Sequence, residues 1–401
     1  MSQSQSQVLG AENSNLVFEK ERLTKYFKMC LTNLSHHYTG LDTSRLTVVY
    51  FATLGLDIIG APLEAKERDD VIAYIYSLQL SFLNEQIEGC HLAKQSGFLG
   101  SRFMGLPYNR DGHDLTSYST CCRELSHQCA TCQCSTVPVL SSYIQGHIAM
   151  TFCSVLTLHA LGDDFSRLNT TSILTGLRHL QQPSGAFQAT SERSECDMRF
   201  LYCACAISAT LNDWTGVDTD RAVQYILNCI TYEGGVSLIP GNEAHGGSTY
   251  TAIASLVLMN ELECLGEERK ERLIRWCLMR QSGGYNGRTN KDNDTCYSFW
   301  IGATLHLLGK FGDTHIPSTR NFILGQCQHK LLGGFAKFPG APPDILHTFY
   351  SLCWLAMAEE PGAATIDCRL GMAAHRSRTI SCKTKNSEKG TIESGTTTLP
   401  S

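Results

Sequence analysis

The stretch from Gly283 to Trp300, GGYNGRTNKDNDTCYSFW, contains the unit from which most of this chain is built. It begins with a glycine pair, continues as a polar strip of about ten residues and ends in an apolar run. Asp294 and Cys296 lie two residues apart, where the strip meets that run. A turn rich in glycine, asparagine and charge makes poor core material, so we interpret it as part of a functional site.

Comparable glycine turns recur along the chain with a nearly constant period. The second residues of four such turns, Gly185, Gly235, Gly284 and Gly334, are separated by steps of 50, 49 and 50 residues. An earlier turn begins at Gly97, 88 residues before Gly185, which is one period plus an insertion of roughly forty residues. A fixed period of this length is typical of a repeat architecture.

Each glycine turn is expected to connect two helices of different character. An amphipathic candidate precedes the turn, for example residues 220–231, whose apolar side chains form one stripe. A polar strip and then an almost wholly apolar run follow it. Five such runs occur, at 148–161, 200–211, 250–259, 298–308 and 348–357. Buried helices inside a ring of amphipathic ones predict an all-α fold, an α/α barrel (toroid) of about six helical hairpins, with an open solenoid as the alternative.

Three segments do not fit the repeat. We expect the polar N-terminus to be flexible and the polar C-terminal tail to be disordered. The third is a Cys-rich insertion, for which we expect a flexible loop; a zinc site made by Cys129, Cys132, Cys134 and His127 is the alternative. The predicted boundaries are 1–16 for the N-terminus, 17–374 for the barrel, 107–142 for the insertion and 375–401 for the tail.

Composition excludes several classes of protein. With 42% hydrophobic residues the chain can form a large core, and its net charge of -5 argues against a general nucleic-acid-binding surface. No run approaches the roughly 20 apolar residues of a membrane span, and the polar N-terminus lacks the pattern of a signal peptide. The 19 cysteines are mostly scattered through apolar helices, which favours a reduced, cytoplasmic protein.

Functional residue types occupy matching places in the polar strips. If the repeats superpose, the strips lead into helix N-termini at one end of the barrel, and these favour anions. Asp294, Cys296 and His347 then come together as oxygen, sulfur and nitrogen ligands, and three protein ligands with an open position are typical of catalytic zinc. The alternative is that Asp294 caps the following helix and Cys296 is one more buried cysteine.

A second group of residues is suited to a phosphorylated ligand. Arg288, Lys291, His245 and Tyr297 combine cations with a phenol near helix N-termini, which suits a diphosphate. The alternative for Arg288 and Lys291 is a solvated charged turn. The sequence contains neither of the common glycine-rich nucleotide-binding motifs, so it gives no support for nucleotide binding.

The motifs in these strips resemble those of a known family. They are SRLT, GHIAMT, DMRFLYCA, EAHGGSTY, GRTNK, DTCYSFW, GGFAK and the LH of DILHTFY, spread over residues 18–357. Together they are similar to the β subunits of protein prenyltransferases, and most similar to the geranylgeranyltransferase type I branch.

The resemblance implies an α/α barrel in an obligate heterodimer with a separate helical-repeat α subunit. It implies one Zn2+ per β subunit, bound by Asp294, Cys296 and His347. It also implies that geranylgeranyl diphosphate is held by His245, Arg288, Lys291 and Tyr297, that Trp300 contributes to the isoprenoid wall, and that Arg199 helps to fix the carboxylate of the acceptor.

Further positions bear on the subtype that the resemblance suggests. Thr47 falls where farnesyl-transferring relatives carry Trp, so a small side chain leaves room for an extra isoprene unit. Lys337 falls where those relatives use an Asp that recruits magnesium, so we expect magnesium not to be required. The pocket for the last acceptor residue, which favours Leu or Phe, is matched by His147, Ala149, Phe200 and Leu346; the alternative for each is simple core packing.

The expected activity is transfer of a geranylgeranyl group to the cysteine of a C-terminal CaaX motif, in proteins such as Rho-, Rac- and Rap-type small GTPases. The expected catalytic residues are Lys337, Cys296, Asp294, His347 and Tyr297. Three alternatives remain open. They are a farnesyltransferase β subunit, a Rab-type prenyltransferase β subunit, and a non-catalytic binding protein or scaffold, including a variant impaired by the insertion.

Overall fold

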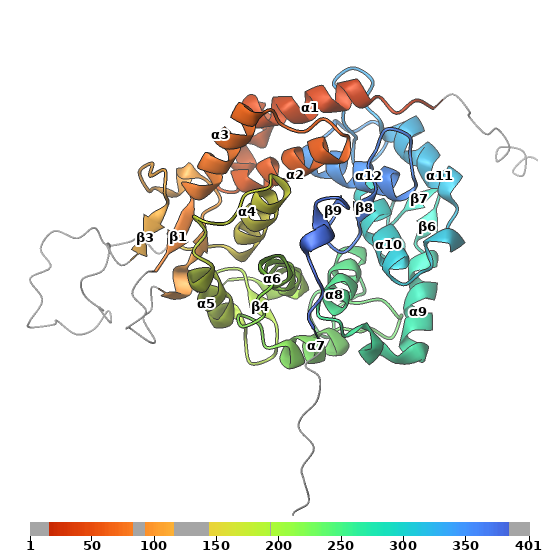
Figure 1. The fold of residues 1–401 in the computed structure, drawn as a ribbon. Coiled ribbons are helices and arrows are strands. Elements are labelled where there is room, and N and C mark those ends of the chain that lie inside the picture. Colours follow the sequence, from red (N-terminus) through yellow and green to blue (C-terminus); the bar gives the residue numbers. More distant parts are fainter. Residues whose placement is uncertain (1–15, 83–92, 116–143, 193, 385–401) are drawn as a thin grey trace, which may run out of the picture.

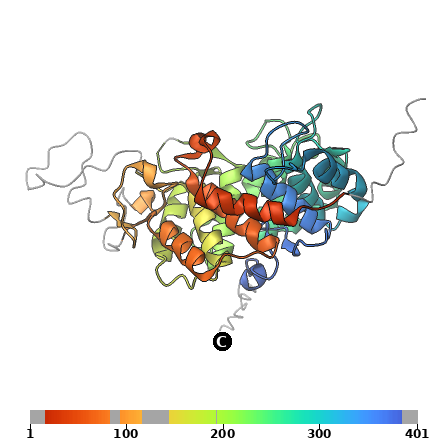
Figure 2. The same cartoon turned by 90° about the horizontal axis from the view of Figure 1, so that it is seen from above.

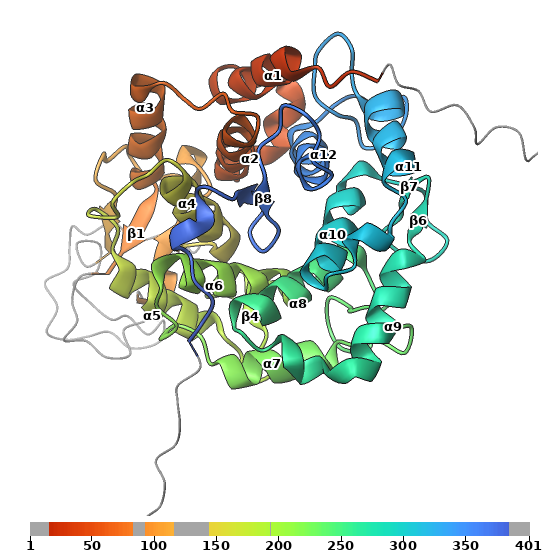
Figure 3. The same ribbon diagram turned by 45° about the vertical axis from the view of Figure 1, so that its right-hand side comes forward.

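The computed structural model describes residues 16–82, 93–115, 144–192 and 194–384, which form two concentric rings of helices (Figure 1, Figure 3). Long apolar side chains surround the inner helices on all sides, whereas the outer helices bury one face. The inner helices are α2 (Arg45–Ile58), α4 (Ile148–Ala160), α6 (Met198–Leu211), α8 (Gly246–Leu258), α10 (Thr295–Leu307) and α12 (Ile345–Met357).

Each inner helix follows an outer one, which gives the six helical hairpins that the repeat predicts. The outer helices are α1 (Lys20–Thr32), α3 (Ala65–Tyr76), α5 (Thr170–Leu180), α7 (Thr219–Asn228), α9 (Gly266–Leu278) and α11 (Ile316–Arg320), the last continuing as the π-helix η7 (Asn321–Cys327). Short 3-10 helices lie in the connections, at His36–Leu41, Ala93–Gln95, Arg102–Met104, Leu262–Leu265, Phe311–Asp313 and Ser377–Thr379.

The inner ring is closed. Neighbouring inner helices pack against each other in chain order, and the last, α12, packs against the first, α2. The open solenoid is therefore excluded, and the predicted α/α barrel is confirmed. The observed helices α8 and α10 begin several residues before the apolar runs at 250 and 298, because the polar N-cap residues His245 and Asp294 already start them.

Strands of two or three residues connect the helices but form no layer of their own. They are β1 (Gln79–Ser81), β2 (Gly97–Phe98), β3 (His113–Asp114), β4 (Phe187–Gln188), β5 (Cys196–Asp197), β6 (Gln281–Ser282), β7 (Gly284–Tyr285), β8 (Ile366–Asp367) and β9 (Met372–Ala373). β1 pairs antiparallel with β2 and parallel with β3, and the other three pairs are antiparallel hairpins. At the turn before β4, a Cβ on Gly185 would lie 2.0 Å from the carbonyl oxygen of Arg221, so glycine is required there.

A repeated hydrogen bond gathers the N-termini of the inner helices at one end of the barrel, which we call the mouth. In five of the six, the N–H at or near the helix start donates to a carbonyl of the next repeat's glycine turn or strip. These pairs are Leu46 to Gly100, Ile148 to Ala189, Met198 to Leu238, Gly246 to Gly287 and Thr295 to Lys337. In α12, Ile345 N–H instead donates to the hydroxyl of Tyr38, at 3.1 Å. The mouth therefore carries six helix N-termini, which favour anionic ligands.

The C-terminal segment closes the opposite end of the barrel. The strands β8 and β9 form a hairpin between the inner helices, and the chain then runs out past that end (Figure 1, Figure 2). Backbone hydrogen bonds join Ala364 to Ile58 and Lys383 to Leu258, both at the C-terminal ends of inner helices. The prediction of disorder from residue 375 is therefore wrong for 375–384, which pack against the barrel; residues 385–401 lie outside the described part.

Two other predicted segments fall mostly outside the described residues. The N-terminal residues 1–15 do so, whereas the carbonyl of Leu16 accepts a hydrogen bond from Arg320. Of the predicted insertion, residues 116–142 lie outside the described part, including all the cysteines proposed as zinc ligands. Residues 107–115 are ordered, because β3 extends the small sheet of β1 and β2. The expectation of a flexible loop is wrong for these residues.

Candidate functional site

A cavity of about 560 Å³ opens at the mouth and is bounded by all six inner helices. Its walls are mostly aromatic, and polar residues gather toward the mouth. Tyr350 packs against Trp300 with ring centroids 5.2 Å apart and stacks on Phe299 at 5.1 Å. The aromatic rings that line it are those of Tyr50, Phe51, Phe152, Tyr202, Tyr250, Tyr297, Phe299, Trp300, Phe349 and Tyr350. Such a pocket suits a long apolar ligand with a charged end.

Asp294, Cys296 and His347 lie together at the wall of this cavity, as predicted. One potential ligand atom from each lies within 4.8 Å of the others, and His347 Nε2 is 3.2 Å from Asp294 Oδ1. Asp294 also accepts the N–H of Cys296 at 3.0 Å and so caps α10. The cap and the cluster, posed as alternatives by the sequence, therefore coexist. An oxygen, a sulfur and a nitrogen at this spacing fit a metal ion with one open position.

Asp344 orients the histidine of the cluster, and the sequence did not single it out as a site residue. Its Oδ2 lies 2.6 Å from His347 Nδ1, while its Oδ1 accepts the backbone N–H of His347. A proton on Nδ1 leaves Nε2 facing Asp294, which is the usual arrangement of a metal-binding histidine with a carboxylate partner. Although burial lowers it, hydrogen bonds to Asp294 and Asp344 raise the pKa of His347 to about 9.

The negative charge that Asp294 and a deprotonated Cys296 would bring to the cluster is only partly balanced by positive side chains of this chain. Burial, and next the charge of Asp294, raises the pKa of the Cys296 thiol well above its usual value. Lys337 Nζ lies 3.6 Å from Asp294 Oδ2 and its side chain is about half exposed. A bound cation would lower the pKa of the Cys296 thiol, because a thiol that coordinates a metal ion is deprotonated. The donor set therefore fits a divalent metal.

His245 and Tyr297 form a hydrogen-bonded pair on the same wall. The N–H of Gly247 donates to His245 Nδ1 at 3.0 Å, so that nitrogen is unprotonated. Burial, and next the charge of Arg288, lowers the pKa of His245 to about 4, so its neutral ring carries its proton on Nε2. Nε2 then donates to the hydroxyl of Tyr297, 2.9 Å away. This leaves the proton of Tyr297 available to a ligand in the cavity.

The remaining predicted diphosphate residues lie in less enclosed positions. Arg288 pairs with Glu243 at 3.4 Å, with both side chains more than 40% exposed. Lys291 is exposed in the same strip, and Arg288 and Lys291 are not among the residues that line the cavity. Thr47 does not line it either; its hydroxyl donates to the carbonyl of Ser44 at 2.7 Å. Their roles stay predictions.

The residues predicted to contact the acceptor divide into two groups. Ala149, Leu346 and Arg199 line the cavity, whereas His147 and Phe200 do not and contact each other, with ring centroids 5.9 Å apart. The guanidinium of Arg199 already forms a two-pronged pair with Asp197, at 2.6 and 3.0 Å, and also reaches Glu195.

One part of the cavity was missed from the sequence altogether. Its lining includes Leu370 and Gly371, at the tip of the C-terminal hairpin. The sequence does contain a signal, since Asp367 and Arg369 repeat the spacing of Asp197 and Arg199 and form the same two-pronged pair.

Two further observations bear on the environment of the protein. The thirteen cysteines within the described residues are all free. No helix among those residues is both long and apolar enough to cross a membrane.

Comparisons with known proteins agree with this architecture. The model of the prenyltransferase alpha-alpha toroid domain matches residues 18–373. The geranylgeranyl transferase type-1 subunit beta of Arabidopsis thaliana is 37% identical, covering 88% of this chain and 89% of the relative. That of Dictyostelium discoideum is also 37% identical, covering 85% and 91%. The solved structure of Candida albicans protein geranylgeranyltransferase-I complexed with GGPP matches with a TM-score of 0.70 at 21% identity, over 90% of this chain and 98% of that one, a likeness of fold.

Proposed function

Because the chain belongs to the prenyltransferase alpha-alpha toroid family, we propose that it is the catalytic β subunit of a heterodimeric, zinc-dependent protein geranylgeranyltransferase type I. The observation that carries the proposal is the cluster of Asp294, Cys296 and His347 at the wall of a deep aromatic cavity. The mouth favours an anionic group, and the cavity favours an apolar chain. Geranylgeranyl diphosphate has an anionic diphosphate at one end of a long apolar chain.

The acceptor is a protein that ends in a CaaX motif, with Leu or Phe preferred at the last position. Small GTPases of the Rho, Rac and Rap types have such ends. Asp294, Cys296 and His347 would hold a zinc ion, which, when bound, lowers the pKa of the acceptor thiol and keeps it as thiolate at neutral pH. Arg199, which lines the cavity, would bind the terminal carboxylate of the acceptor in addition to its pairing with Asp197 and Glu195.

The reaction forms a thioether. The acceptor sulfur attacks C1 of the prenyl diphosphate, the C1–O bond breaks and diphosphate leaves with the bonding electrons, while the thiol proton is lost to solvent. Lys337, whose carbonyl accepts the N–H of Thr295 at the start of α10, and Tyr297 both line the cavity, and their ammonium and hydroxyl would stabilise the charge that grows on the leaving diphosphate. Arg288 and Lys291 add positive charge in the neighbouring strip. Because Lys337 supplies an ammonium at this position, added magnesium is not required.

The first test is transfer by the chain co-expressed with a prenyltransferase α subunit, in the cytoplasmic setting that we propose, without added magnesium. Twenty-carbon and fifteen-carbon prenyl diphosphates are compared with a peptide ending in Leu. Preferential transfer of the twenty-carbon group supports the proposal, and preference for the shorter one identifies a farnesyltransferase. A metal-loaded but inactive heterodimer favours a binding role, and removing residues 116–143 then tests whether the insertion blocks the site.

The ligand set has its own test. Cys296→Ala is expected to lose the bound metal and activity together, whereas Cys277→Ala keeps both, because Cys277 is a buried free cysteine of α9 outside the cluster. Metal content per heterodimer is measured after dialysis. Stoichiometric metal in the Cys296→Ala protein would remove this residue from the ligand set.

A further inference from the structure

The polar strip that follows β7 is held in place on both sides of Arg288. On one side, the carbonyl of Gly287 accepts the N–H of Gly246 at the start of α8, at 2.9 Å. A Cβ on Gly287 would lie 2.1 Å from the ring of Tyr297, so the backbone lies directly against that phenol. On the other side is Thr289, whose hydroxyl is bound by side chains from outside the strip.

Arg288 and Lys291 are the first and last residues of a four-residue turn. The N–H of Lys291 donates to the carbonyl of Arg288 at 3.3 Å, and the third residue, Asn290, has a φ of 59°. Asparagine tolerates this left-handed conformation better than most residues do. The turn therefore carries one cation at each end, and Thr289 is its second residue.

Two side chains outside the turn bind the hydroxyl of Thr289. Arg280 Nη1 donates to Thr289 Oγ1 at 2.9 Å, and the hydroxyl donates to Glu233 Oε2 at 3.4 Å. The same carboxylate oxygen accepts the indole N–H of Trp276 at 3.3 Å, and the guanidinium of Arg280 lies 5.1 Å from the centroid of the Trp276 ring. The four side chains thus form one connected network that joins the turn to α9 and to the preceding glycine turn.

Arg280 makes this attachment firm. Its side chain is buried, since the residue is only 7% exposed, and among the described residues its Nε has no hydrogen-bond partner. A buried cation is costly when its hydrogen bonds are not made, so the guanidinium cannot readily exchange Thr289 for water. Thr289 itself is exposed. The bond therefore fixes an exposed turn to a buried group.

We propose that the hydroxyl of Thr289 positions this turn so that Arg288 and Lys291 can bind the diphosphate. The proposal rests on the proposed function, which it deepens by naming a positioning residue for the charged end of the ligand. Thr289 does not line the cavity, so it acts through its two neighbours rather than by contact. A turn that is already fixed loses less conformational freedom when the ligand binds, and this strengthens binding.

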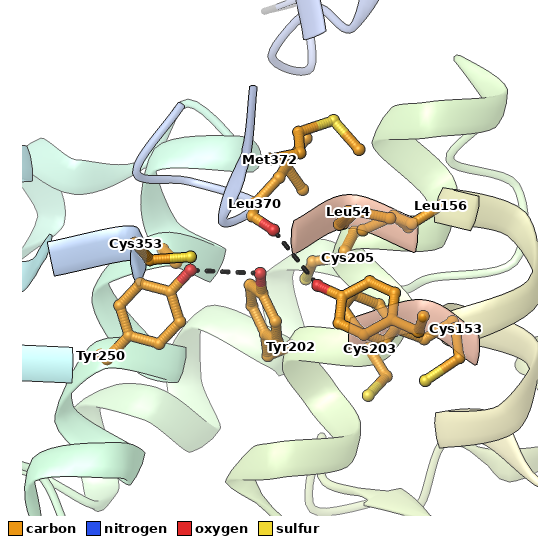
Figure 4. Close-up of a cluster of buried hydrophobic side chains, with 14 of the residues drawn as sticks. Leu54, Cys153, Leu156, Tyr202, Cys203, Cys205, Tyr250, Cys353, Leu370 and Met372 are labelled. Carbon is orange, nitrogen blue, oxygen red and sulfur yellow. Dashed lines mark hydrogen bonds between the residues drawn. The ribbon is translucent and has the colours of Figure 1, made fainter. Parts of the chain in front are cut away.

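The apolar part of the cavity is held by different contacts. Tyr202 donates to the carbonyl of Arg369 at 2.9 Å, and Tyr50 reaches that of Leu370 at 3.5 Å. The hydroxyls of Tyr202 and Tyr250 lie 3.3 Å apart, as Figure 4 shows. None of these bonds involves the strip, so a change at Thr289 should leave the wall that holds an apolar chain unaltered.

Thr289→Val removes the hydroxyl and keeps the branched shape of the side chain. It leaves Arg280 Nη1 without its acceptor and releases the turn. A hydrogen bond to a charged group changes an equilibrium constant by roughly ten-fold or more. We therefore expect the dissociation constant of geranylgeranyl diphosphate to rise by about ten-fold. That of geranylgeraniol, which has the same chain and no charge, should stay within about two-fold, because only the charged end meets the turn.

The experiment measures both dissociation constants for the heterodimer, by competition with a fluorescent analogue of geranylgeranyl diphosphate that is first titrated against each variant. Thr289→Ser keeps the hydroxyl and should restore wild-type binding. Thr210→Val is the matched control, because it makes the same change near the C-terminal end of α6, where the hydroxyl donates to the carbonyl of Ala206 at 2.8 Å. It should change neither constant.

A second variant tests the partner of the hydroxyl. Arg280→Met removes the guanidinium and should also weaken binding of the diphosphate. Because Arg280 and Thr289 act through one bond, the double variant should bind no more weakly than the weaker single variant. Fully additive losses would mean that the two residues act independently, which overturns the network.

The outcomes separate this inference from the function on which it rests. A loss confined to the diphosphate and restored by serine supports the positioning role. Equal losses for the two ligands, or no loss, in a well-folded Thr289→Val heterodimer overturn that role alone, provided that the wild type transfers the twenty-carbon group. Absence of any binding of geranylgeranyl diphosphate to the wild-type heterodimer overturns the positioning role and the proposed function together.

Discussion

Among single residues, Asp344 combines capping of a helix with orientation of a candidate ligand. One carboxylate oxygen accepts the N–H of His347 and so caps α12, while the other faces His347 Nδ1. Asn at this position keeps the cap, because Asn is as good an N-cap as Asp. The substitution removes the negative charge that makes the imidazole of His347 a stronger metal ligand.

Asp344→Asn is therefore expected to weaken metal binding by about 10- to 100-fold with little loss of thermal stability. Competition with a chromogenic chelator measures the affinity, and thermal unfolding measures the stability. The matched control is Asp218→Asn, which makes the same change at the N-cap of α7, outside the cluster. Equal metal affinity in the two variants would show that Asp344 is only a cap.

His245 gives a pH dependence whose sign can be worked out. Its folded pKa is about 4 because of burial and Arg288, below the ordinary value of 6.5. Between these values the unfolded chain binds the proton and the folded protein does not, so the stability falls as the pH falls from 6.5 toward 4. The largest possible contribution is about 3 kcal/mol, from about 1.4 kcal/mol for each pH unit.

The measurement is the free energy of unfolding between pH 7 and pH 4, for the wild type and for His245→Asn. The variant should lose less stability than the wild type below pH 6.5, and the difference between them should be constant above it. Parallel curves over the whole range would mean that His245 titrates normally in the folded protein.

At the scale of the elements, glycine sets how closely the first hairpin packs. Gly55 of α2 lies under Phe27 of α1, and a Cβ there would be 2.4 Å from the ring. Because Phe27 is fully buried and cannot turn outward, the two helices would have to separate. Overpacking of this kind costs about 1–3 kcal/mol, partly offset by about 1 kcal/mol from the higher helix propensity of alanine.

Gly55→Ala is thus expected to lower the free energy of unfolding, by up to about 2 kcal/mol after the offset. Gly40→Ala is the control, since Gly40 is exposed and a Cβ there would meet nothing within 4 Å. Its effect should stay within about 0.5 kcal/mol. Denaturant unfolding of both variants decides the matter, and an unchanged midpoint for Gly55→Ala would mean that α1 can shift freely.

The elements also show what the sequence could and could not predict. Apolar runs located the inner helices, because a helix buried on all sides leaves a continuous signal. For α8 the predicted start was several residues too late. Gly246, Gly247 and Ser248 are small or polar and give no apolar signal, and only the N-cap His245 marks where the helix begins. The metal cluster was found because a fixed period brings equivalent strips to one end of a barrel.

The missed features depend on contacts between distant parts of the chain. The hairpin of β8 and β9 has strands of two residues, too short for any periodic signal, and its phenol partners are up to 320 positions away. The carboxylate pairing of His347 with Asp344 is local, but its meaning depends on Asp294 from the neighbouring repeat. Sequence spacing alone gives neither.

At the scale of the whole molecule, the C-terminal segment fastens the closed ring across several inner helices. Arg376 pairs with Asp57 of α2, and its carbonyl lies 2.9 Å from His159 Nε2 of α4. Lys383 reaches the end of α8 through its backbone N–H, at 2.8 Å. The segment therefore connects inner helices that lie far apart along the chain.

Ending the chain after Ala374 should destabilise the ring, whereas ending it after Thr384 removes none of these contacts. The first truncation leaves the carboxylate of Asp57 buried without either Arg376 or His375. Leaving a buried acceptor without its partner costs about 1–3 kcal/mol. Arg376→Met isolates this pair, because it keeps much of the side chain's packing and removes its charge and its two hydrogen bonds to Asp57. Thermal unfolding of the heterodimers should rank the wild type and the longer truncated chain as equal, with Arg376→Met and the shorter chain below them.

Hydrogen exchange should rise mainly at the C-terminal ends of α2, α4 and α8, which the segment joins. Uniform exchange around the ring would instead mean that the helices alone hold the barrel closed and that the segment only rests on it.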